Sequence, residues 1–324
     1  LGNVFATHPA YVQWYEYTGV LGGSLWILAT NFFCWALAKN LFMQELARLL
    51  RSINSLLLFS ISAIFISAPA VFSIWLYKRH VDNVGKPLNV VVVQPNIDPW
   101  NEKFNGSGDE QLAKMLRLAA SVSDSSTDYI IFPETALPDG IWEKELKNNG
   151  QIATIRKFIT AFPKATIIIG ASTFRAYHDE DTRSATARKY EEGKFYYDVF
   201  NTALQIDSRD SIQIYHKTRL VPGVEIMPYP KIFGFLEKFA IDLGGTSGSL
   251  GRQDDRTVFV SSNGIKVAPA ICYESIYGDF LRQYVKKGAN LITIITNDGW
   301  WKKTPGHIQH FHYARLRAIE TGCW

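Results

Sequence analysis

Hydrophobic positions are distributed unevenly along the 324 residues of this chain. Residues 20–38 contain no charged side chain, and residues 56–77 are again uncharged, with one proline at Pro69. Each run is long enough to cross about 30 Å of hydrocarbon as a helix. The alternative is a pair of helices buried in a protein core, but such helices seldom stay uncharged over this length. The pattern therefore predicts two transmembrane helices in a membrane region of residues 1–86.

Charged side chains around these runs predict their orientation. The segment between the two runs carries three basic residues and one acid, namely Lys39, Arg48, Arg51 and Glu45. Cytoplasmic loops carry an excess of Lys and Arg, so this segment is expected on the cytoplasmic side of the membrane. Everything after the second run is then expected on the outer side, because long domains translocate largely regardless of their charge.

From about residue 87 the pattern changes to alternating strands and helices, which is typical of an α/β domain. Residues 88–94 form a near-continuous apolar run, as expected for a strand covered on both faces. Two strands are expected to form a hairpin across residues 207–210, and charged residues 175–194 to form an irregular surface excursion. The remaining predictions are strands at 129–132, 165–170, 265–271 and 290–296, and helices at 111–122, 151–161, 279–287 and 307–320.

Residues 221–251 are rich in Gly, Pro and aromatic side chains and show few signals of regular structure. In a compact domain, a segment of this length more often forms a lid or binding loops. We expect a mobile, membrane-facing cover, because exposed apolar side chains mark lipid or partner surfaces. The alternative is that the apolar side chains of this segment complete the core of the domain. The side chains concerned are Met227, Tyr229, Ile232, Phe233, Phe235, Leu236 and Phe239.

Composition narrows the possible functions. Hydrophobic residues make up 47% of the chain, charged residues 20%, and the net charge is +4. No basic stripe interleaved with aromatics is present, so nucleic acid is not an expected partner. A metal is not expected either, because His307, His310 and His312 would not share one face of their helix. Three cysteines are too few and too scattered for a disulfide framework or a zinc site: Cys34, Cys272 and Cys323.

Three side chains with complementary chemistry each follow a strand-like stretch. They are Glu134 after residues 129–132, Lys217 after the second hairpin strand, and Cys272 after residues 265–271. Aligned strands present their ends together, so these groups can converge on one pocket. The Glu would accept the thiol proton, and the Lys would raise the thiolate fraction and stabilise an oxyanion. The alternative for Cys272 is a small buried hydrophobic residue, the commoner fate of a free cysteine.

These residues belong to an ordered series of motifs that resembles bacterial apolipoprotein N-acyltransferases, the membrane-bound branch of the nitrilase superfamily. The resemblance covers essentially the whole chain after residue 88. The motifs are Gln94-Pro95-Asn96, Pro133-Glu134-Thr135, Asn201-Thr202-Ala203, His216-Lys217, Cys272-Tyr273-Glu274, Asn297-Asp298-Gly299-Trp300 and Leu316-Arg317-Ala318-Ile319-Glu320.

The resemblance implies a nitrilase-like α-β-β-α sandwich over residues 87–324, preceded by the transmembrane helices. The family's catalytic triad falls on Glu134, Lys217 and Cys272, and its additional essential acid falls on Glu225. Residues 221–228 depart from the family's loop pattern but keep this acid and the closing proline. The family's earlier membrane helices and final segments have no counterpart, so the domain is expected to be truncated at its C-terminus. Supporting or substrate-binding positions fall on Asn201, Tyr273, Glu274 and Trp300.

The activity implied by this resemblance is acyl transfer through a thioester on Cys272. The acyl donor would be a membrane phospholipid, and the acceptor the N-terminal diacylglyceryl-cysteine amine of an apolipoprotein. A monomer without a cofactor is expected, in the bacterial cytoplasmic (inner) membrane with its catalytic domain on the periplasmic side. The triad alone does not separate this activity from a membrane-tethered nitrilase-type amidase, in which water resolves the thioester. A third alternative is a non-enzymatic membrane scaffold with an unreactive Cys272.

Overall fold

The computed structural model describes residues 1–43, 53–81, 86–190, 195–226 and 249–322. The chain separates into two compact units, Leu1–Pro87 with Ile308–Trp324, and Leu88–His307. The boundary near residue 87 matches the change in sequence pattern, but residues 308–324 group with the N-terminal unit and not with the α/β domain. The apolar side chains of the expected cover, at positions 227–239, and Cys323 lie outside the described residues.

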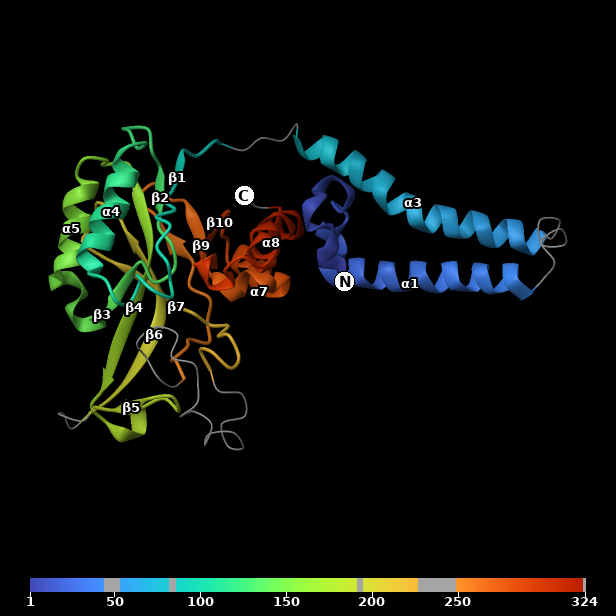
Figure 1. Cartoon of the computed structure of the whole chain (residues 1–324). Coiled ribbons are helices and arrows are strands. Elements are labelled where there is room, and N and C mark those ends of the chain that lie inside the picture. Colours follow the sequence, from blue (N-terminus) through green and yellow to red (C-terminus); the bar gives the residue numbers. More distant parts are fainter. Residues whose placement is uncertain (44–52, 82–85, 191–194, 227–248, 323–324) are drawn as a thin grey trace. The chain divides into compact units, whose positions relative to one another are not determined.

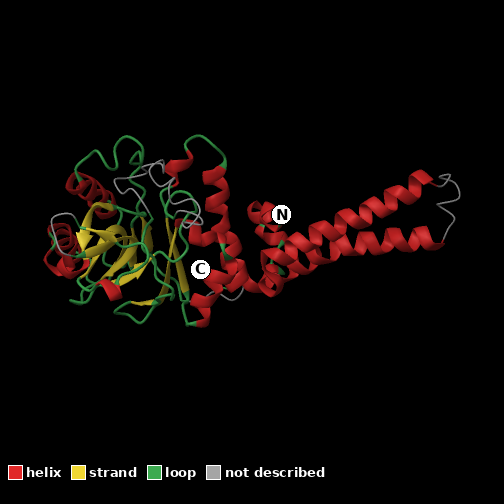
Figure 2. Ribbon diagram, turned by 90° about the horizontal axis from the view of Figure 1, so that it is seen from below, coloured by secondary structure: helices red, strands yellow, loops and turns green. Residues whose placement is uncertain are grey.

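The N-terminal unit is dominated by two long helices, α1 (Tyr15–Met43) and α3 (Ile53–Val81), which lie side by side (Figures 1 and 2). They run antiparallel, because Trp26 Nε1 of α1 donates to the Phe65 carbonyl of α3 at 2.9 Å while the Trp14 amide, before α1, meets Ser73 Oγ at 3.4 Å. Tyr15–Lys39 and Phe59–Arg79 are long and apolar enough to cross a membrane. Both helices expose large apolar side chains, unlike core helices: Leu21 is 83% exposed and Ile64 is 64% exposed.

Helix α1 is broken near its start and held there by the C-terminal helix α8 (Gly306–Thr321). Gly19 has φ 66 and ψ −179, which is non-helical and interrupts the regular hydrogen bonding of the helix just before Val20. Glu320 Oε1 accepts from the Val20 amide at 2.7 Å. Leu316 of α8 is buried with Ala6, Val12 and Tyr15 next to two short 3₁₀ turns, η1 (Gly2–Thr7) and η2 (Pro9–Tyr11). These contacts explain why the segment joins the N-terminal unit.

The α/β unit contains two sheets. The larger has the order β1-β2-β4-β6-β5, with β3 paired to β4 and β7 paired to β6, and the smaller has the order β10-β9-β8. β1, β2 and β4 are parallel, β4, β6 and β7 are antiparallel in turn, and β9 and β10 are parallel. The strands are β1 (Val90–Val92), β2 (Tyr129–Ile131), β3 (Leu137–Trp142), β4 (Thr166–Tyr177), β5 (Arg188–Lys189), β6 (Tyr196–Ile206), β7 (Gln213–His216), β8 (Phe259–Val260), β9 (Lys266–Ile271) and β10 (Leu291–Ile295).

The two sheets and their helices form four layers, as Figure 1 shows for the left half of the view. Alternation along the strands builds two cores, because successive side chains point to opposite faces. Ile167 and Ile169 face helices α4 (Gly108–Ala120) and α5 (Gly150–Ile159), whereas Ile168 faces the smaller sheet. Helix α7 (Gly278–Lys286) packs on that smaller sheet through Phe280, Leu281 and Tyr284. This is the predicted α-β-β-α sandwich.

Three features of the sheet differ from the sequence-based expectations. β1 is an edge strand, and Val92 is 72% exposed, so its apolar run is not covered on both faces. β3 was not predicted, because Pro138 and Gly140 lie within it and both are unfavourable in strand interiors. The charged excursion begins later than expected, since β4 continues through Arg175 to Tyr177 and pairs with β6 from Ile167 to Tyr177.

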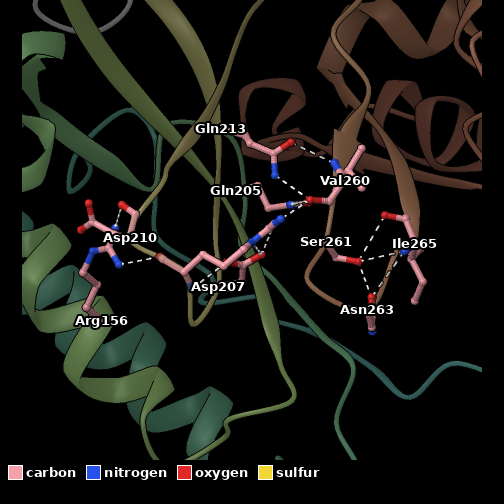
Figure 3. Close-up of polar contacts among 10 residues, drawn as sticks. Arg156, Gln205, Asp207, Asp210, Gln213, Val260, Ser261, Asn263 and Ile265 are labelled. Atoms are coloured by element: carbon pink, nitrogen blue, oxygen red, sulfur yellow. Dashed lines mark hydrogen bonds and ion pairs between the residues drawn. The ribbon is translucent and has the colours of Figure 1, made fainter.

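The predicted hairpin of β6 and β7 is confirmed, and its turn is joined to the smaller sheet by polar contacts (Figure 3). The Val260 carbonyl accepts from Gln205 Nε2 at 3.1 Å, from Gln213 Nε2 at 2.7 Å and from the Arg209 guanidinium at 2.6 Å. Arg209 also pairs with the buried Asp207 carboxylate. These bonds connect the two sheets where the turn would otherwise leave buried polar groups unpaired.

Candidate active site

Glu134 lies on a tight turn directly after β2. The next residue, Thr135, has φ 49, a left-handed conformation that is costly for a β-branched residue. The turn is pressed against β4 at Gly170, where an added Cβ would come within 2.4 Å of the Thr135 amide and 2.6 Å of the Pro133 carbonyl. Gly170 donates to that carbonyl at 3.1 Å. The absence of a side chain at position 170 therefore lets the backbone hold the Glu134 carboxylate in place.

Lys217, directly after β7, joins two carboxylates. Its Nζ donates to Glu134 Oε1 at 3.0 Å and to Glu225 Oε1 at 2.8 Å, and its side chain is 1% exposed. Asn201 on β6 bridges the same two acids, because Nδ2 donates to Glu134 Oε1 at 2.7 Å and to Glu225 Oε1 at 3.0 Å. The Asn201 carbonyl also accepts the Lys217 amide at 2.8 Å. Attraction to the two carboxylates outweighs burial, so the pKa of Lys217 lies well above its usual value.

Cys272 stands at the C-terminal end of β9, at the first position of the 3₁₀ turn η6 (Cys272–Ile276). Its φ of 48 is a strained, left-handed conformation for a residue with a Cβ. Glu274, which is fully buried, holds this turn: its carboxylate accepts from the Ile271 amide at 2.8 Å and from the Thr218 amide at 2.7 Å. Glu274 thereby ties the backbone that carries the thiol to the backbone that carries Lys217.

The thiol is protonated at neutral pH in this arrangement. Burial, and then the negative charge of Glu134, raise the pKa of Cys272 to about 12, although Lys217 and a hydrogen bond with Thr296 lower it. The Lys217 charge does favour the thiolate, as expected, but desolvation of the sulfur outweighs that charge. For Glu134, burial acts in the opposite direction to the two lysines, Lys217 and Lys103, whose attraction lowers the pKa of this carboxyl. An ionised carboxylate thus lies beside a protonated thiol.

A cavity of about 320 Å³ contains all three groups and opens between loops at the strand ends. Most of the other predicted site residues also line it: Asn201, Glu225 and Trp300. Trp300 lies in the 3₁₀ turn η7 (Asp298–Trp301), with its ring 5.1 Å from that of Trp100 and 6.5 Å from that of Phe104. The two residues after Cys272 do not line the cavity: Glu274 is the backbone tie described above, and the Tyr273 ring packs against Tyr277 at 5.3 Å.

The structure adds three residues that were not among the predicted site residues, although Asn297 belongs to the Asn297-Asp298-Gly299-Trp300 motif. The Asn297 amide donates to Glu134 Oε2 at 3.3 Å, and the Thr296 side chain hydrogen-bonds to Cys272. Both follow β10 (Leu291–Ile295), and Asn297 directly follows the strand predicted at residues 290–296, so its position was a usable signal. Lys103 is buried in the loop between β1 and α4 and donates from Nζ to the Glu134 carbonyl at 3.0 Å. No strand or motif in the sequence marks Lys103.

No metal-binding group of three or more His, Cys, Asp or Glu side chains occurs within the described ranges. The side chains that line the cavity can do nucleophilic chemistry. Glu134 can take the thiol proton, the sulfur can attack a carbonyl carbon, and the Lys217 ammonium can stabilise the oxyanion that forms. The fold and the site together define a sandwich protein in which a cysteine thiol, a carboxylate and an ammonium line one cavity.

Comparison with known proteins agrees with this class. The sequence model of the carbon-nitrogen hydrolase family matches residues 89–324, and the chain therefore belongs to that family. Among curated relatives, an apolipoprotein N-acyltransferase of Chlorobaculum tepidum is 30% identical over 326 residues, which cover 98% of this chain and 58% of the relative. One from Allorhizobium ampelinum is 32% identical over 243 residues, which cover 74% of this chain and 42% of the relative.

The chain thus spans about half the length of the curated relatives it matches. Among solved structures, a CN-hydrolase superfamily protein from Xanthomonas campestris matches with a TM-score of 0.47 and 17% identity, over 74% of each chain.

Proposed function

We propose that this protein is a membrane-bound N-acyltransferase that carries an acyl group on Cys272. The observation that carries the proposal is the convergence of Glu134, Lys217 and Cys272 on one cavity, in a chain that also has two exposed apolar helices. The similarity to curated apolipoprotein N-acyltransferases supports the choice of reaction. The acyl donor is then a phospholipid, and the acceptor is the α-amine of a diacylglyceryl-cysteine at a lipoprotein N-terminus.

The first half-reaction loads the thiol. Glu134 removes the thiol proton as sulfur attacks the ester carbonyl, which forms the C–S bond and moves the negative charge to the carbonyl oxygen. The Lys217 ammonium stabilises this oxyanion. Collapse of the intermediate breaks the ester C–O bond, and Glu134 returns its proton to the leaving oxygen. The products of this half are an acyl thioester on Cys272 and a lysophospholipid.

The second half-reaction transfers the acyl group. The acceptor amine attacks the thioester carbonyl, and Glu134 takes a proton from the nitrogen. The C–S bond then breaks, and Glu134 gives this proton to the leaving sulfur. An amide and the free thiol result, so the enzyme returns to its starting state. Glu225, paired with Lys217 through a 2.8 Å contact, keeps that ammonium oriented while the Glu134 carboxyl is protonated.

The membrane location belongs to the same proposal. Lys39 lies over the Trp35 ring at 5.3 Å and Arg79 over the Trp75 ring at 5.7 Å, each near the C-terminal end of its apolar helix. Aromatic rings and basic side chains with apolar stems are favoured where the bilayer meets water. We place the two helices across the bacterial cytoplasmic (inner) membrane, with the segment between them inside and the α/β unit on the periplasmic side. Both substrates are lipids, so they reach the site from the bilayer.

Mass spectrometry of the intact protein, purified in detergent and mixed with phospholipid, tests this function. We expect a mass increase equal to one acyl group, which disappears when a diacylglyceryl-cysteine peptide is added and reappears on that peptide. If the adduct is instead lost to water while the peptide stays unmodified, and small amides release ammonia, the protein is an amidase. If no adduct forms with any donor, both enzymatic functions are wrong and a scaffold role remains.

A further inference from the structure

The cavity holds a second lysine, Lys103, whose side chain is as enclosed as the proposed triad. Lys103 is 5% exposed and lines the cavity with Cys272 and Glu134. Its Nζ donates to the Glu134 carbonyl at 3.0 Å and lies 5.7 Å from the centre of the Phe104 ring. A buried ammonium is costly unless other charges compensate for it. If this position only needed to be filled, an apolar side chain would avoid the free-energy cost of burying an ammonium.

The charges around Lys103 indicate that its ammonium balances the charge of the cluster. It interacts with the Glu134 carboxylate, the Cys272 thiol and the Lys217 ammonium, and Lys217 is bonded to both Glu134 and Glu225. With the thiol protonated, two carboxylates and two ammonium groups leave the cluster neutral. Transfer of the thiol proton to Glu134 keeps the cluster neutral, because the proton only moves within it. Without the Lys103 charge, the same step would take place in a cluster with a net negative charge.

The backbone contact of Lys103 adds a second link to the same base. The Glu134 carbonyl belongs to the turn that contains Thr135 at φ 49 and that rests against Gly170. Such strain persists only where surrounding contacts hold it. The Lys103 ammonium is one of these contacts, and it binds the turn at the residue that carries the carboxylate.

We propose that Lys103 is a positioning residue of the acylation step, which holds the Glu134 turn through its carbonyl and supplies the positive charge that compensates the second carboxylate of the cluster. This inference rests on the proposed function, because it presupposes that Cys272 becomes acylated. It assigns to Lys103 an action through Glu134 and through the charge of the cluster.

The role predicts a pH dependence whose sign is clear. Burial lowers the pKa of Lys103 to about 8, and repulsion from Lys217 adds to this, whereas Glu134 and Cys272 oppose it. The ammonium is present below that pH and is lost as the pH rises through it. The other groups facing it titrate elsewhere: the pKa of Cys272 is about 12, that of Lys217 lies well above its usual value, and that of Glu134 is lowered. Acylation should therefore slow down above about pH 8.

The experiment measures thioester formation by intact mass, with phospholipid as the only substrate, between about pH 6.5 and pH 9.5. The acceptor peptide is left out because its own α-amine titrates near pH 8. We expect the wild-type rate at pH 9 to be about tenfold below that at pH 7, since one protonated group with a pKa near 8 is required. Lys103→Met should be slow at every pH and should lack this alkaline decline, whereas Lys103→Arg should keep the charge and move the decline to higher pH.

The matched control is Lys114→Met, which removes an exposed lysine of α4 and should leave the wild-type profile unchanged. A purely structural role for Lys103 would lower the Lys103→Met rate by the same factor at every pH and preserve the decline, which would overturn the inference. The wild-type profile needs no variant to fold, and a rate that stays flat to pH 9.5 would overturn the inference by itself. Thioester formation without the decline refutes Lys103 alone, whereas no thioester at any pH refutes the proposed function and this inference with it.

Discussion

The two ends of the β6–β7 hairpin bury charge in different ways. At the turn, Asp207 pairs with Arg209, and the Val260 carbonyl collects three side-chain donors (Figure 3). At the other end, Lys217 is shared between Glu134 and Glu225 next to a cavity. Both ends contain buried acids paired with bases, so a buried ion pair does not by itself identify an active site.

Two physical features distinguish the cavity end. First, the backbone there is strained, with left-handed φ values at Thr135 and Cys272, each next to or at a proposed reacting group. Second, its ion pairing is shared, since the Glu134 and Glu225 carboxylates both bind the Lys217 ammonium beside a thiol whose pKa is raised to about 12. The turn end has one acid with one base, and it connects the two sheets. Backbone strain and shared charges beside a cavity are typical of an active site, whereas pairing of one acid with one base is typical of a structural ion pair.

The largest expected difference between the two ends concerns Cys272. Cys272→Ala should abolish thioester formation and acyl transfer, because Cys272 is the only thiol among the described residues that line the cavity. Cys34→Ala and Cys323→Ala should keep wild-type activity in the same assay. Turnover at the wild-type rate by Cys272→Ala would remove the distinction between the ends altogether.

The second prediction concerns the rate of alkylation of Cys272, which depends on its raised pKa. In a protein with Cys34→Ala and Cys323→Ala, iodoacetamide should alkylate Cys272 roughly a thousandfold more slowly at pH 8 than it alkylates an ordinary exposed thiol. The rate should continue to rise through pH 10, because the thiolate fraction increases until the pH reaches about 12. Mass spectrometry follows the alkylation. An alkylation rate that reaches a plateau near pH 8.5 would show that the sulfur is neither buried nor opposed by the charge of Glu134.

Substitution of Glu134 and of Lys217 should slow acylation to a similar extent but should differ in the effect on stability. Glu134→Gln should slow thioester formation by about a hundredfold or more, since the base is lost. Its melting temperature should change little, because Lys217 keeps Glu225 as a partner. Lys217→Met should slow the reaction to a similar extent and also reduce the free energy of unfolding by roughly 3–5 kcal/mol, since two buried carboxylates lose their shared partner. Equal stability of the two variants would contradict the shared pairing.

The smallest effect on activity is expected at the turn. Asp207→Asn should lower the free energy of unfolding by about 1–3 kcal/mol, because it weakens the charge-assisted contact between the buried Asp207 carboxylate and the partly exposed Arg209. Thioester formation by the folded variant should stay within about twofold of wild type, since the rate depends on the other end of the hairpin. Chemical denaturation together with the acylation assay measures both quantities. A large loss of rate at full stability would mean that the two ends are coupled.

Much of this arrangement could be predicted from local pattern, and the failures have identifiable causes. Strands with regular apolar alternation, such as residues 166–170 of β4, were found, whereas β3 was missed because of Pro138 and Gly140. Glu134, Lys217 and Cys272 could be singled out because each follows a strand. Lys103 could not, because it lies in a loop whose path into the cavity depends on contacts with the distant Glu134 turn.

The sequence by itself determined the two apolar helices, the order of strands and helices, and the residue types at the strand ends. These depend on side-chain periodicity and backbone preference, which act over a few residues. Only the tertiary structure decided that Lys217 is shared by two acids, that Cys272 is protonated at rest, and that α8 groups with the N-terminal unit. Desolvation and charge pairing depend on which distant segments become neighbours, and no local pattern contains that information.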